Sequence, residues 1–327
     1  MRKLASLLTM LAAGAVLAAF GYNPARAETV SIAHSTWVGY GPLYIARDKG
    51  FFKENGVDVE LIVMEDPKER FPTLMADKIQ MIASTIDTAL LYMKGPDDFQ
   101  YVVAIDDSNG GDGIVANKDI KSIADLKGKN VAVNEGSVSD FYLNVLLQRE
   151  GLKQSDINVV NMTASDAGAA FVSKQVDAAV TWEPWLSRGK TAEHGHLLVD
   201  SSTTPGLITD AIIVKKTWLK DHTKETAAIV KSWNQAIDYY REHPDESIEI
   251  MAKGVGGWLK DPKEFKATLT GIKFYGAEDN KAFFGTMDKP GPLSQTVAEA
   301  IKVWSSQGRL QVETSPDKLI DYSFVSQ

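Results

Sequence analysis

Short apolar segments alternate with longer amphipathic segments over the first two thirds of the chain. Apolar and polar side chains alternate along Val57–Met64, which predicts a strand. A helix is predicted over Leu43–Lys49, because Pro42 suits its first position and Gly50 its end. The other strand-like segments are Val30–Ala33, Met81–Ser84, Tyr101–Ile105, Ile114–Ala116, Asn130–Asn134, Val159–Met162, Asp177–Thr181, Leu197–Val199 and Ile208–Val214. The other helix-like segments include Phe71–Asp77, Ser137–Gln148, Ser165–Lys174, Thr223–Glu242, Pro244–Lys253, Pro262–Thr270 and Ser294–Gln307.

This alternation predicts an α/β protein whose strands are mostly parallel and are joined by crossover helices. One set of strands ends near Ala116, a second set runs to about Asp200, and Ile208–Val214 leads back to the first. We therefore predict two lobes, each a mixed, mostly parallel sheet flanked by helices. Residues 28–116 and 207–327 form lobe one, with a helical C-terminal part, and residues 117–206 form the inserted lobe two. The cleft between two hinged lobes is the expected ligand site.

The N-terminus has the layout of a secretory signal peptide. Two cations, Arg2 and Lys3, precede an apolar run over Leu4–Phe20, and Ala25–Ala27 is a small-x-small cleavage site. We expect residues 1–27 to be removed after Ala27 and the protein to be periplasmic; an uncleaved anchor is the alternative. The chain has no cysteine, which excludes a lipid-anchored cysteine, disulfides and thiolate metal sites.

The net charge of −8 argues against nucleic acids and anionic membranes as partners, and we expect a monomer. The five histidines lack metal-binding helical spacing, and no nucleophile elbow or phosphate loop occurs. We therefore expect no catalytic residue, no metal and no cofactor.

The candidate binding residues stand where strands end, because ligands of open α/β sheets bind at the carboxyl ends of strands. Pro184 forces a turn after the strand Asp177–Thr181 and leaves Trp182, Glu183 and Trp185 at its end. Two indoles beside a carboxylate suit a small, polar and cationic solute. The alternative is that both indoles belong to the core and that Glu183 is a solvated helix cap.

Two further junctions carry polar residues. Asp87 follows the strand Met81–Ser84 and either caps the next helix or accepts hydrogen bonds from a ligand. Ser137 follows Asn130–Asn134 and can hold a ligand oxygen, cap the helix, or do both. Glu135, at the same junction of lobe two, could be a second acid opposite Asp112.

The segment from Asp106 to Gly113 is predicted to be a loop that contains three carboxylates and an amide. Asp106, Asp107 and Asp112 could surround a cationic head group there. A calcium loop is excluded because no glutamate stands at the twelfth position. A solvated turn is the remaining alternative.

Three segments resemble signatures of the nitrate/sulfonate/taurine group of ABC-transporter substrate-binding proteins. They are Trp37–Ala46 followed by Lys49–Phe52, Ile123–Lys129 with Val131–Val133, and Val176–Trp185. The resemblance implies a type II periplasmic-binding-protein fold that captures a small solute between its lobes. It also implies delivery of the solute to an inner-membrane permease powered by an ATPase. In this family the loop at Gly39–Gly41 faces the cleft, which makes Trp37 and Tyr40 ligand-binding candidates.

The candidate segments are rich in acids and poor in cations. We therefore predict a small nitrogen-rich cation or zwitterion as the solute. Guanidinium is the best-matched example, because its planar fork matches carboxylates and stacks on tryptophan. Urea-like amides follow, and taurine, an aliphatic sulfonate or an aminopyrimidine is the alternative within the same transporter class. Asp210 is a weaker candidate on the returning strand.

Two other function classes stay open. The fold resembles that of pyrimidine-precursor synthases of thiamine biosynthesis, but those enzymes act inside the cell and this chain carries an export signal. A sensory co-receptor that presents its ligand to a membrane receptor is the second.

Overall fold

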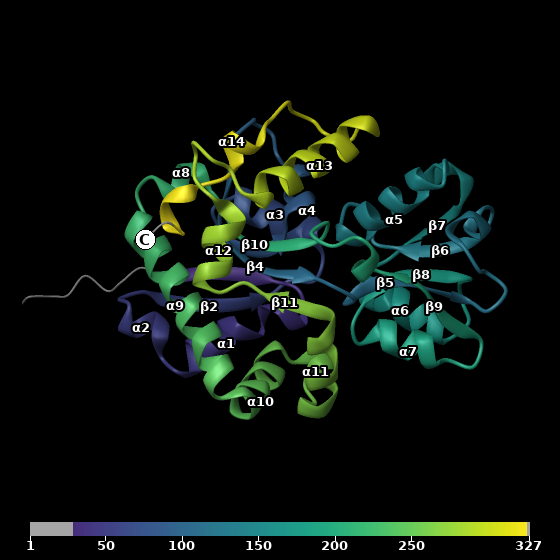
Figure 1. The fold of residues 1–327 in the computed structure, drawn as a ribbon, viewed down its shortest axis with the longest axis horizontal. Helices are drawn as coiled ribbons and strands as arrows, with labels where there is room; N and C mark the ends of the chain where they lie inside the picture. The colour runs from purple at the N-terminus through teal and green to yellow at the C-terminus, as the bar shows by residue number, and fades with distance from the viewer. Residues whose placement is uncertain (1–28, 326–327) are drawn as a thin grey trace, which may run out of the picture.

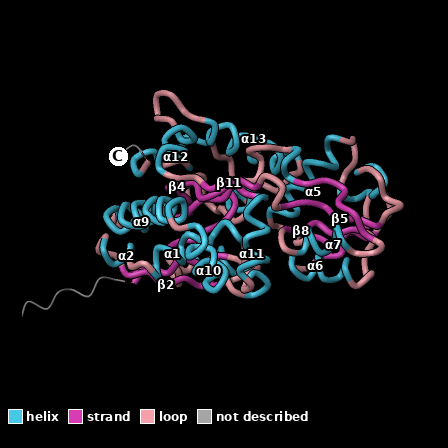
Figure 2. Tube along the Cα trace, turned by 60° about the horizontal axis from the view of Figure 1, so that its bottom comes forward, coloured by secondary structure: helices cyan, strands magenta, loops and turns pink. Residues whose placement is uncertain are grey.

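The computed structural model describes residues 29–325, so the predicted signal peptide over residues 1–27 lies outside the described residues. The described chain contains two β-sheets that lie side by side along the long axis of the molecule (Figure 1). Helices surround the strands of both sheets (Figure 2). We call the six-stranded sheet and the helices packed on it the first lobe, and the five-stranded sheet with its helices the second lobe.

The sheet of the first lobe has the strand order β11-β4-β10-β3-β1-β2. Strand β1 pairs in parallel with β2 and β3, and β10 runs antiparallel between β3 and β4. The strands are β1 (Thr29–His34), β2 (Asp58–Val63), β3 (Met81–Thr85), β4 (Phe99–Ser108), β10 (Thr209–Lys215) and β11 (Ile272–Phe274). Strand β11 lies in the part of the chain that was predicted to be almost entirely helical.

The sheet of the second lobe has the order β7-β6-β8-β5-β9. Strand β6 pairs in parallel with β7 and β8, whereas β5 pairs antiparallel with β8 and β9. The strands are β5 (Asp112–Asn117), β6 (Asn130–Val133), β7 (Asn158–Asn161), β8 (Ala178–Trp182) and β9 (Gly195–Asp200). A mixed, mostly parallel sheet flanked by helices was predicted for each lobe, and this α/β fold class is confirmed. The sheets are mixed but not mostly parallel, because three of the five strand pairings in the first sheet and two of the four in the second are antiparallel.

The helices follow the predicted β–α alternation and then fill the C-terminal third of the chain. In the first lobe, before the crossing, they are α1 (Gly41–Asp48), α2 (Phe51–Glu54), α3 (Pro67–Met75) and α4 (Ile86–Leu90). The second lobe carries α5 (Val138–Arg149), α6 (Ala164–Val172) and α7 (Trp185–Thr191). The C-terminal third contains α8 (Lys216–Leu219), α9 (Thr223–Glu242), α10 (Pro244–Val255), α11 (Pro262–Thr268), α12 (Ala277–Phe284), α13 (Pro292–Ser306) and α14 (Pro316–Leu319).

The first crossing between the lobes lies earlier than the sequence predicted. Residues 114–116 were assigned to lobe one, but they belong to β5, whose residue Ile114 pairs with Val180 of β8. The second lobe therefore begins at Asp112, and the predicted boundary at 116 is wrong. A short apolar strand suits the interior of either sheet, so only its pairing partners decide where it belongs. The return crossing lies between β9 and β10.

The expected loop from Asp106 to Gly113 is also mostly strand. Asp106 and Asp107 lie within β4, all of whose residues are buried, and Asp112 opens β5. Only residues 109–111 connect the two strands. Polar residues at the end of a central strand resemble a loop in the sequence, but here they continue the pairing with β10.

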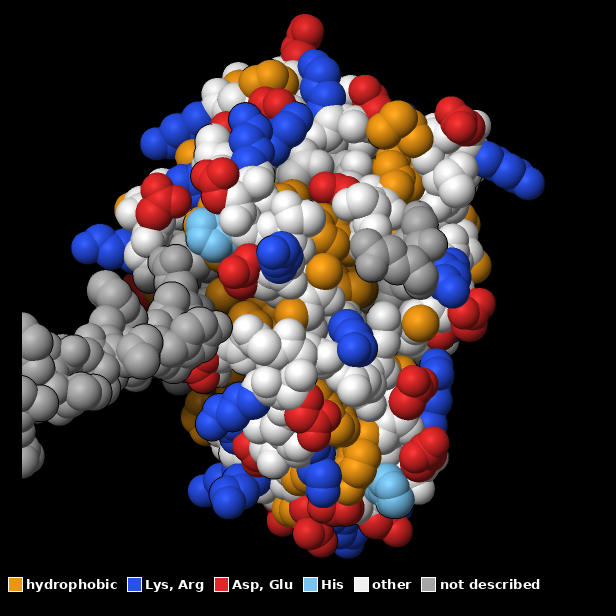
Figure 3. Space-filling model, turned by 90° about the vertical axis from the view of Figure 1, so that its left-hand side faces the viewer, with side chains coloured by type: hydrophobic (Ala, Val, Ile, Leu, Met, Phe, Trp, Pro, Cys, Tyr) orange, Lys and Arg blue, Asp and Glu red, His pale blue; other side chains and the backbone are white. Residues whose placement is uncertain are grey.

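The largest apolar core lies mainly in the first lobe, where it includes Trp233 and Trp304 from the C-terminal helices, and it extends to Phe141 and Trp182 of the second lobe. The face of this lobe seen in Figure 3 carries cationic and acidic side chains that are interspersed, with apolar side chains only in small groups. Among residues 29–325, no helix is both long enough and apolar enough to cross a membrane.

Candidate functional site

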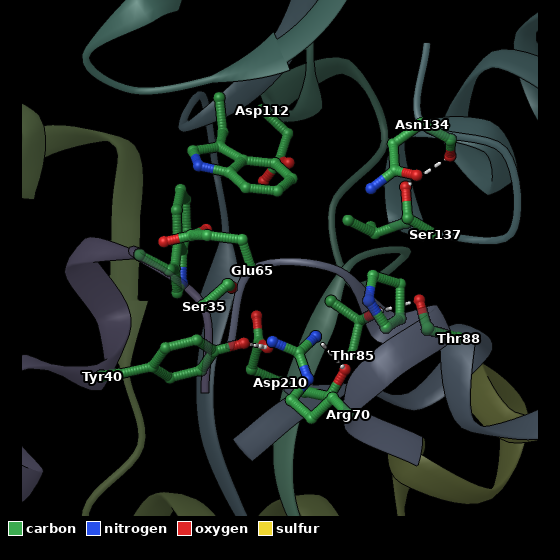
Figure 4. Close-up of a pocket in the computed structure, with 15 residues that line it drawn as sticks. Ser35, Tyr40, Glu65, Arg70, Thr85, Thr88, Asp112, Asn134, Ser137 and Asp210 are labelled. Carbon is green, nitrogen blue, oxygen red and sulfur yellow. Dashed lines mark hydrogen bonds between the residues drawn. The ribbon is translucent and has the colours of Figure 1, made fainter. Parts of the chain in front are cut away.

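A cavity lies between the two lobes and encloses about 430 Å³ of empty space, counting the open solvent at its mouth. The last residue of β8 and the segments that follow β1, β2, β3 and β6 meet around it, which is the arrangement expected at the carboxyl ends of strands. Figure 4 shows Asp112, Asn134 and Ser137 of the second lobe across from first-lobe residues. The lining residues are Ser35, Trp37, Tyr40, Glu65, Pro67, Arg70, Ser84, Thr85, Thr88, Asp112, Asn134, Ser137, Val138, Trp182 and Asp210.

Arg70 supplies a buried cation on the floor of the cavity. It lies in α3 with only 4% of its surface exposed. Its Nη1 donates to the carbonyl oxygen of Met64 at 2.8 Å, and its Nη2 lies 3.5 Å from Ser84 Oγ. Its buried Nε has no hydrogen-bond partner among the residues that the structure describes. A buried guanidinium that lines a cavity is suited to hold an anionic group.

Buried carboxyl groups surround this cation. Asp210 of β10 is 2% exposed and accepts a short hydrogen bond from Tyr40 Oη. Burial raises the pKa of Asp210 to about 8, helped by the charges of Asp112 and Asp87 and opposed by Arg70. Asp106 accepts a hydrogen bond of 3.1 Å from Trp37 Nε1, and burial raises its pKa well above the usual value.

Two further acids lie close to the cavity. Burial raises the pKa of Asp112, at the start of β5, to about 7, and Glu183 adds to the shift. Asp87 lies in the first turn of α4, where Thr88 Oγ1 donates to its Oδ2 at 3.2 Å. Its Oδ1 has no partner within the described part of the chain, and burial raises its pKa to about 7. Several of these acids therefore hold protons near neutral pH, and the cavity is less negative than its count of carboxyl groups indicates.

The second lobe provides the opposite wall. Ser137 caps α5, because its Oγ accepts from the backbone N–H of Ser139 at 3.2 Å and donates to the carbonyl of Asn134 at 2.7 Å. Trp182 reaches across to the first lobe, where its Nε1 donates to the carbonyl of Thr36 at 3.2 Å. The cavity is thus closed by a direct hydrogen bond between the lobes.

Half of the residues predicted from the sequence line this cavity. They are Trp37, Tyr40, Asp112, Ser137 and Trp182, and the weaker candidate Asp210 joins them. Asp87 is buried beside the cavity but does not line it, and the cap of α4 that was considered for it is Thr85.

The other four predicted residues lie outside the cavity lining. Asp107 is on β4 and lies 3.4 Å from Thr209 Oγ1. Glu135 is half-buried, and its backbone N–H donates to Asn161 Oδ1 at 3.0 Å. Glu183 accepts from the backbone N–H and the Oγ of Ser187, at 3.1 and 2.7 Å, in the first turns of α7. Trp185 packs against Trp258, Arg188 and Gly168.

Sequence reasoning missed Arg70, which changes the charge balance of the site. The helix after β2 was predicted to begin at Phe71, which left Arg70 in the preceding loop. The helix begins instead at Pro67, with Asp66 as its cap. A cap followed by proline at the first helical position was the signal that could have found this start. The other lining residues that were missed are Ser35, Glu65, Pro67, Ser84, Thr85, Thr88, Asn134 and Val138.

The lining residues are suited to bind a small polar solute. Within residues 29–325, no group of three or more His, Cys, Asp or Glu side chains is placed to hold a metal ion. The cavity combines one buried guanidinium, hydroxyl groups, carboxyl groups and two indoles. Such a set can hold an anionic oxygen group at one end and a hydrogen-bond donor at the other.

Known proteins with similar sequences are mostly binding proteins. A putative binding protein of Brucella abortus is 28% identical over 64% of this chain and 66% of its own length. A putative aliphatic sulfonates-binding protein of Bacillus subtilis is 27% identical, covering 64% of this chain and 65% of its own length. The chain thus spans just under two thirds of these relatives. The taurine-binding periplasmic protein of Escherichia coli is 24% identical over 90% of this chain and 92% of its own length.

Solved structures show the same fold. The periplasmic aliphatic sulphonate binding protein SsuA of Escherichia coli matches 92% of this chain and 99% of its own, with a TM-score of 0.70 and 19% identity. The periplasmic nitrate-binding protein NrtA of Synechocystis PCC 6803 matches 90% of this chain and 86% of its own, with a TM-score of 0.69 and 16% identity. The predicted type II periplasmic-binding-protein fold is confirmed by these likenesses.

The family model described as NMT1/THI5 like matches residues 37–247, which include every residue that lines the cavity except Ser35. The resemblance to the nitrate, sulfonate and taurine binding proteins that the sequence motifs indicated is confirmed by the same comparisons. This chain belongs to the NMT1/THI5-like family.

Proposed function

We propose that this protein is the solute-binding component of an ABC importer for small organic sulfonates, and that its best-matched solute is an aminosulfonate such as taurine. One observation carries the proposal. The buried guanidinium of Arg70 lines the same cavity as the carboxyl groups of Asp112 and Asp210. A zwitterion that bears an acid and an amine satisfies both kinds of group at once.

The sulfonate end fits the part of the cavity where donors gather. Arg70 offers a charged donor, and Ser35 and Thr85 of the first lobe offer hydroxyl groups. Ser137 of the second lobe stands at the N-terminus of α5, a twelve-residue helix whose dipole favours a negative charge. Three sulfonate oxygens can thus be shared between the lobes.

The ammonium end fits the acids and the indoles. Asp112 and Asp210 approach from different lobes, and a single ionised carboxylate is enough to pair with one ammonium group. Trp37 and Trp182 also line the cavity, and an indole face attracts a cation and covers methylene groups.

Guanidine, which the sequence favoured, is supported less well. That hypothesis depended on an excess of acids without a cation in the site, whereas Arg70 lies among them. The relatives named for sulfonates and taurine support the same choice.

A periplasmic location and delivery to an inner-membrane permease follow from the same proposal. They are supported by the periplasmic relatives and by the signal-peptide pattern of residues 1–27. We expect the protein to act as a monomer and to carry out no chemistry on its solute.

Isothermal titration calorimetry with a panel of solutes tests the proposal. We expect taurine to bind more tightly than ethanesulfonate, which lacks the amine, and both to bind more tightly than guanidine. Nitrate and an aminopyrimidine complete the panel. Guanidine or the aminopyrimidine binding in preference to both sulfonates would overturn the assignment. A true solute should also raise the melting temperature, because it binds only the folded protein.

A further inference from the structure

A fully buried carboxylate, Asp140, lies in the first turn of α5 behind the second-lobe wall of the cavity. Its Oδ2 accepts the backbone N–H of Gly136 at 2.8 Å. Its Oδ1 accepts from Asn144 Nδ2 at 2.7 Å and from Gln154 Nε2 at 3.0 Å. All three donors belong to the second lobe. Asp140 therefore fixes the segment Asn134–Ser137, two residues of which line the cavity.

The fourth donor to the Asp140 carboxylate comes from the first lobe. Arg309 follows α13, and its Nη1 forms a short ion pair with Asp140 Oδ2. The Arg309 guanidinium also lies over the ring of Trp304, 4.7 Å from its centroid. Trp304 is fully buried in the core of the first lobe. Figure 1 shows α13 extending from the first lobe toward α5.

Trp304 links this contact to the floor of the cavity. Its Nε1 donates to the carbonyl of Asp87 at 2.9 Å, in the first turn of α4. Its ring packs against Phe141 of α5, with the ring centroids 5.5 Å apart. The segment from Trp304 to Arg309 thus touches the helices that carry the cavity walls of both lobes.

We propose that Arg309 is a positioning residue for solute capture, whose ion pair with Asp140 holds the lobes closed over the bound solute. The inference rests on the proposed function, because it assumes a solute in the cavity. When the lobes separate, Asp140 keeps three donors from its own lobe and Arg309 keeps its stacking on Trp304. Neither group is left as an isolated buried charge, so the contact can form and break reversibly.

A second ion pair between the lobes provides the matched comparison. Arg188 Nη2 of α7 lies 3.2 Å from Glu264 Oε2 of α11, and the two side chains are 37% and 52% exposed. In the first pair Arg309 is 31% exposed, but its partner Asp140 is 0% exposed. An ion pair with both side chains exposed is screened by water and salt and contributes little, whereas a pair whose carboxylate is buried is screened less. Arg309, and not Arg188, should therefore control the closed state.

The first test measures taurine binding by calorimetry and stopped-flow kinetics in Arg309→Gln, Arg309→Lys and Arg188→Gln. We expect Arg309→Gln to raise the Kd about tenfold, mostly through faster dissociation, and to leave the melting temperature of the solute-free protein nearly unchanged. Arg309→Lys should restore most of the affinity. Arg188→Gln should stay within about twofold of the parent protein. A lower solute-free melting temperature with unchanged taurine kinetics would make Arg309 a purely structural residue and overturn the proposal.

The second test needs no solute. The chain has no cysteine, so spin labels on Lys53→Cys and Lys118→Cys report the separation of the lobes without background labelling. Both positions are exposed, one in each lobe. Arg309→Gln should move the distance distribution toward longer separations, and Arg188→Gln should not. If the parent protein fails to bind taurine but Arg309→Gln still opens the lobes, the solute assignment alone is wrong. An unchanged distribution alongside normal taurine binding would refute the role of Arg309 alone.

Discussion

Arg70→Gln is the substitution that tests the charge balance of the cavity most directly. Arg70 is the only lining residue with a positive charge, and its Nε has no hydrogen-bond partner among residues 29–325. Glutamine keeps a polar side chain but removes the charge and the planar fork. We expect the affinity for sulfonates to fall while the fold is retained.

The magnitude follows from the bonds that the solute would lose. A hydrogen bond to a charged group contributes about 1.5–3 kcal/mol, so losing one raises the Kd by roughly 10- to 150-fold. The substitution also removes the donor to the Met64 carbonyl and the cation that opposes protonation of Asp210. Those two losses act in the solute-free protein as well. They should therefore lower the melting temperature of the solute-free protein. The rise in Kd should mainly reflect the lost bond to the solute.

Calorimetry with taurine and ethanesulfonate separates these effects. Arg70→Lys keeps the charge but not the fork, and its affinity should lie between those of the parent and Arg70→Gln. Lys53→Gln is the matched control, because it removes the same charge from the exposed surface of α2. Its Kd should stay within about twofold of the parent value.

The reasoning is refuted if a folded Arg70→Gln protein binds both sulfonates as tightly as the parent. Circular dichroism and the melting temperature establish whether the variant is folded. A loss of affinity in Lys53→Gln as large as that in Arg70→Gln would attribute the effect to net charge rather than to the cavity.

Three other predictions follow from the acids. Asp112→Asn should weaken taurine binding about tenfold and ethanesulfonate binding much less, because only taurine offers an ammonium group; equal losses in calorimetry would contradict this role. Glu183→Gln should leave both affinities within about twofold, because the Glu183 carboxylate is bonded to Ser187 outside the cavity lining. Burial raises the pKa of Asp210 to about 8, so the folded protein holds a proton that the unfolded chain has already released. Its contribution to the free energy of unfolding should fall as the pH rises from about 4, where the unfolded carboxyl titrates, to about 8. His34, whose pKa is lowered from 6.5 to about 4, affects stability between those two values, so the pH window from about 6.5 to 8 lies above its effect. Asp210→Asn should flatten the dependence of the melting temperature on pH over this window, and an unchanged slope would count against the raised pKa.

Local patterns in the sequence were sufficient for the fold class and for part of the site. Strands and helices could be placed because each has its own period of apolar residues and its own end signals, such as Pro42 and Gly50 around α1. Trp182 and Ser137 could be found because both stand where a strand ends, and such ends meet at one edge of a sheet. The family signatures added Trp37 and Tyr40.

Long-range pairing decided what the local patterns left open. Residues 114–116 fit either sheet, and their hydrogen bonds to β8 and β9 assign them to the second lobe. Asp106 and Asp107 resemble loop residues, yet they continue β4 because β10 and β11 pair with them.

The sequence by itself determined the α/β class, several strand ends and the family, because these depend on residues that are neighbours along the chain. Only the tertiary structure decided the chemistry of the cavity. It brings Arg70 of α3 together with Asp210 of β10, although 140 positions separate them in the sequence. It also moves Glu183 and Trp185 out of the cavity lining. Burial then sets the protonation of the acids, and burial is a property of the packed molecule that no single segment carries.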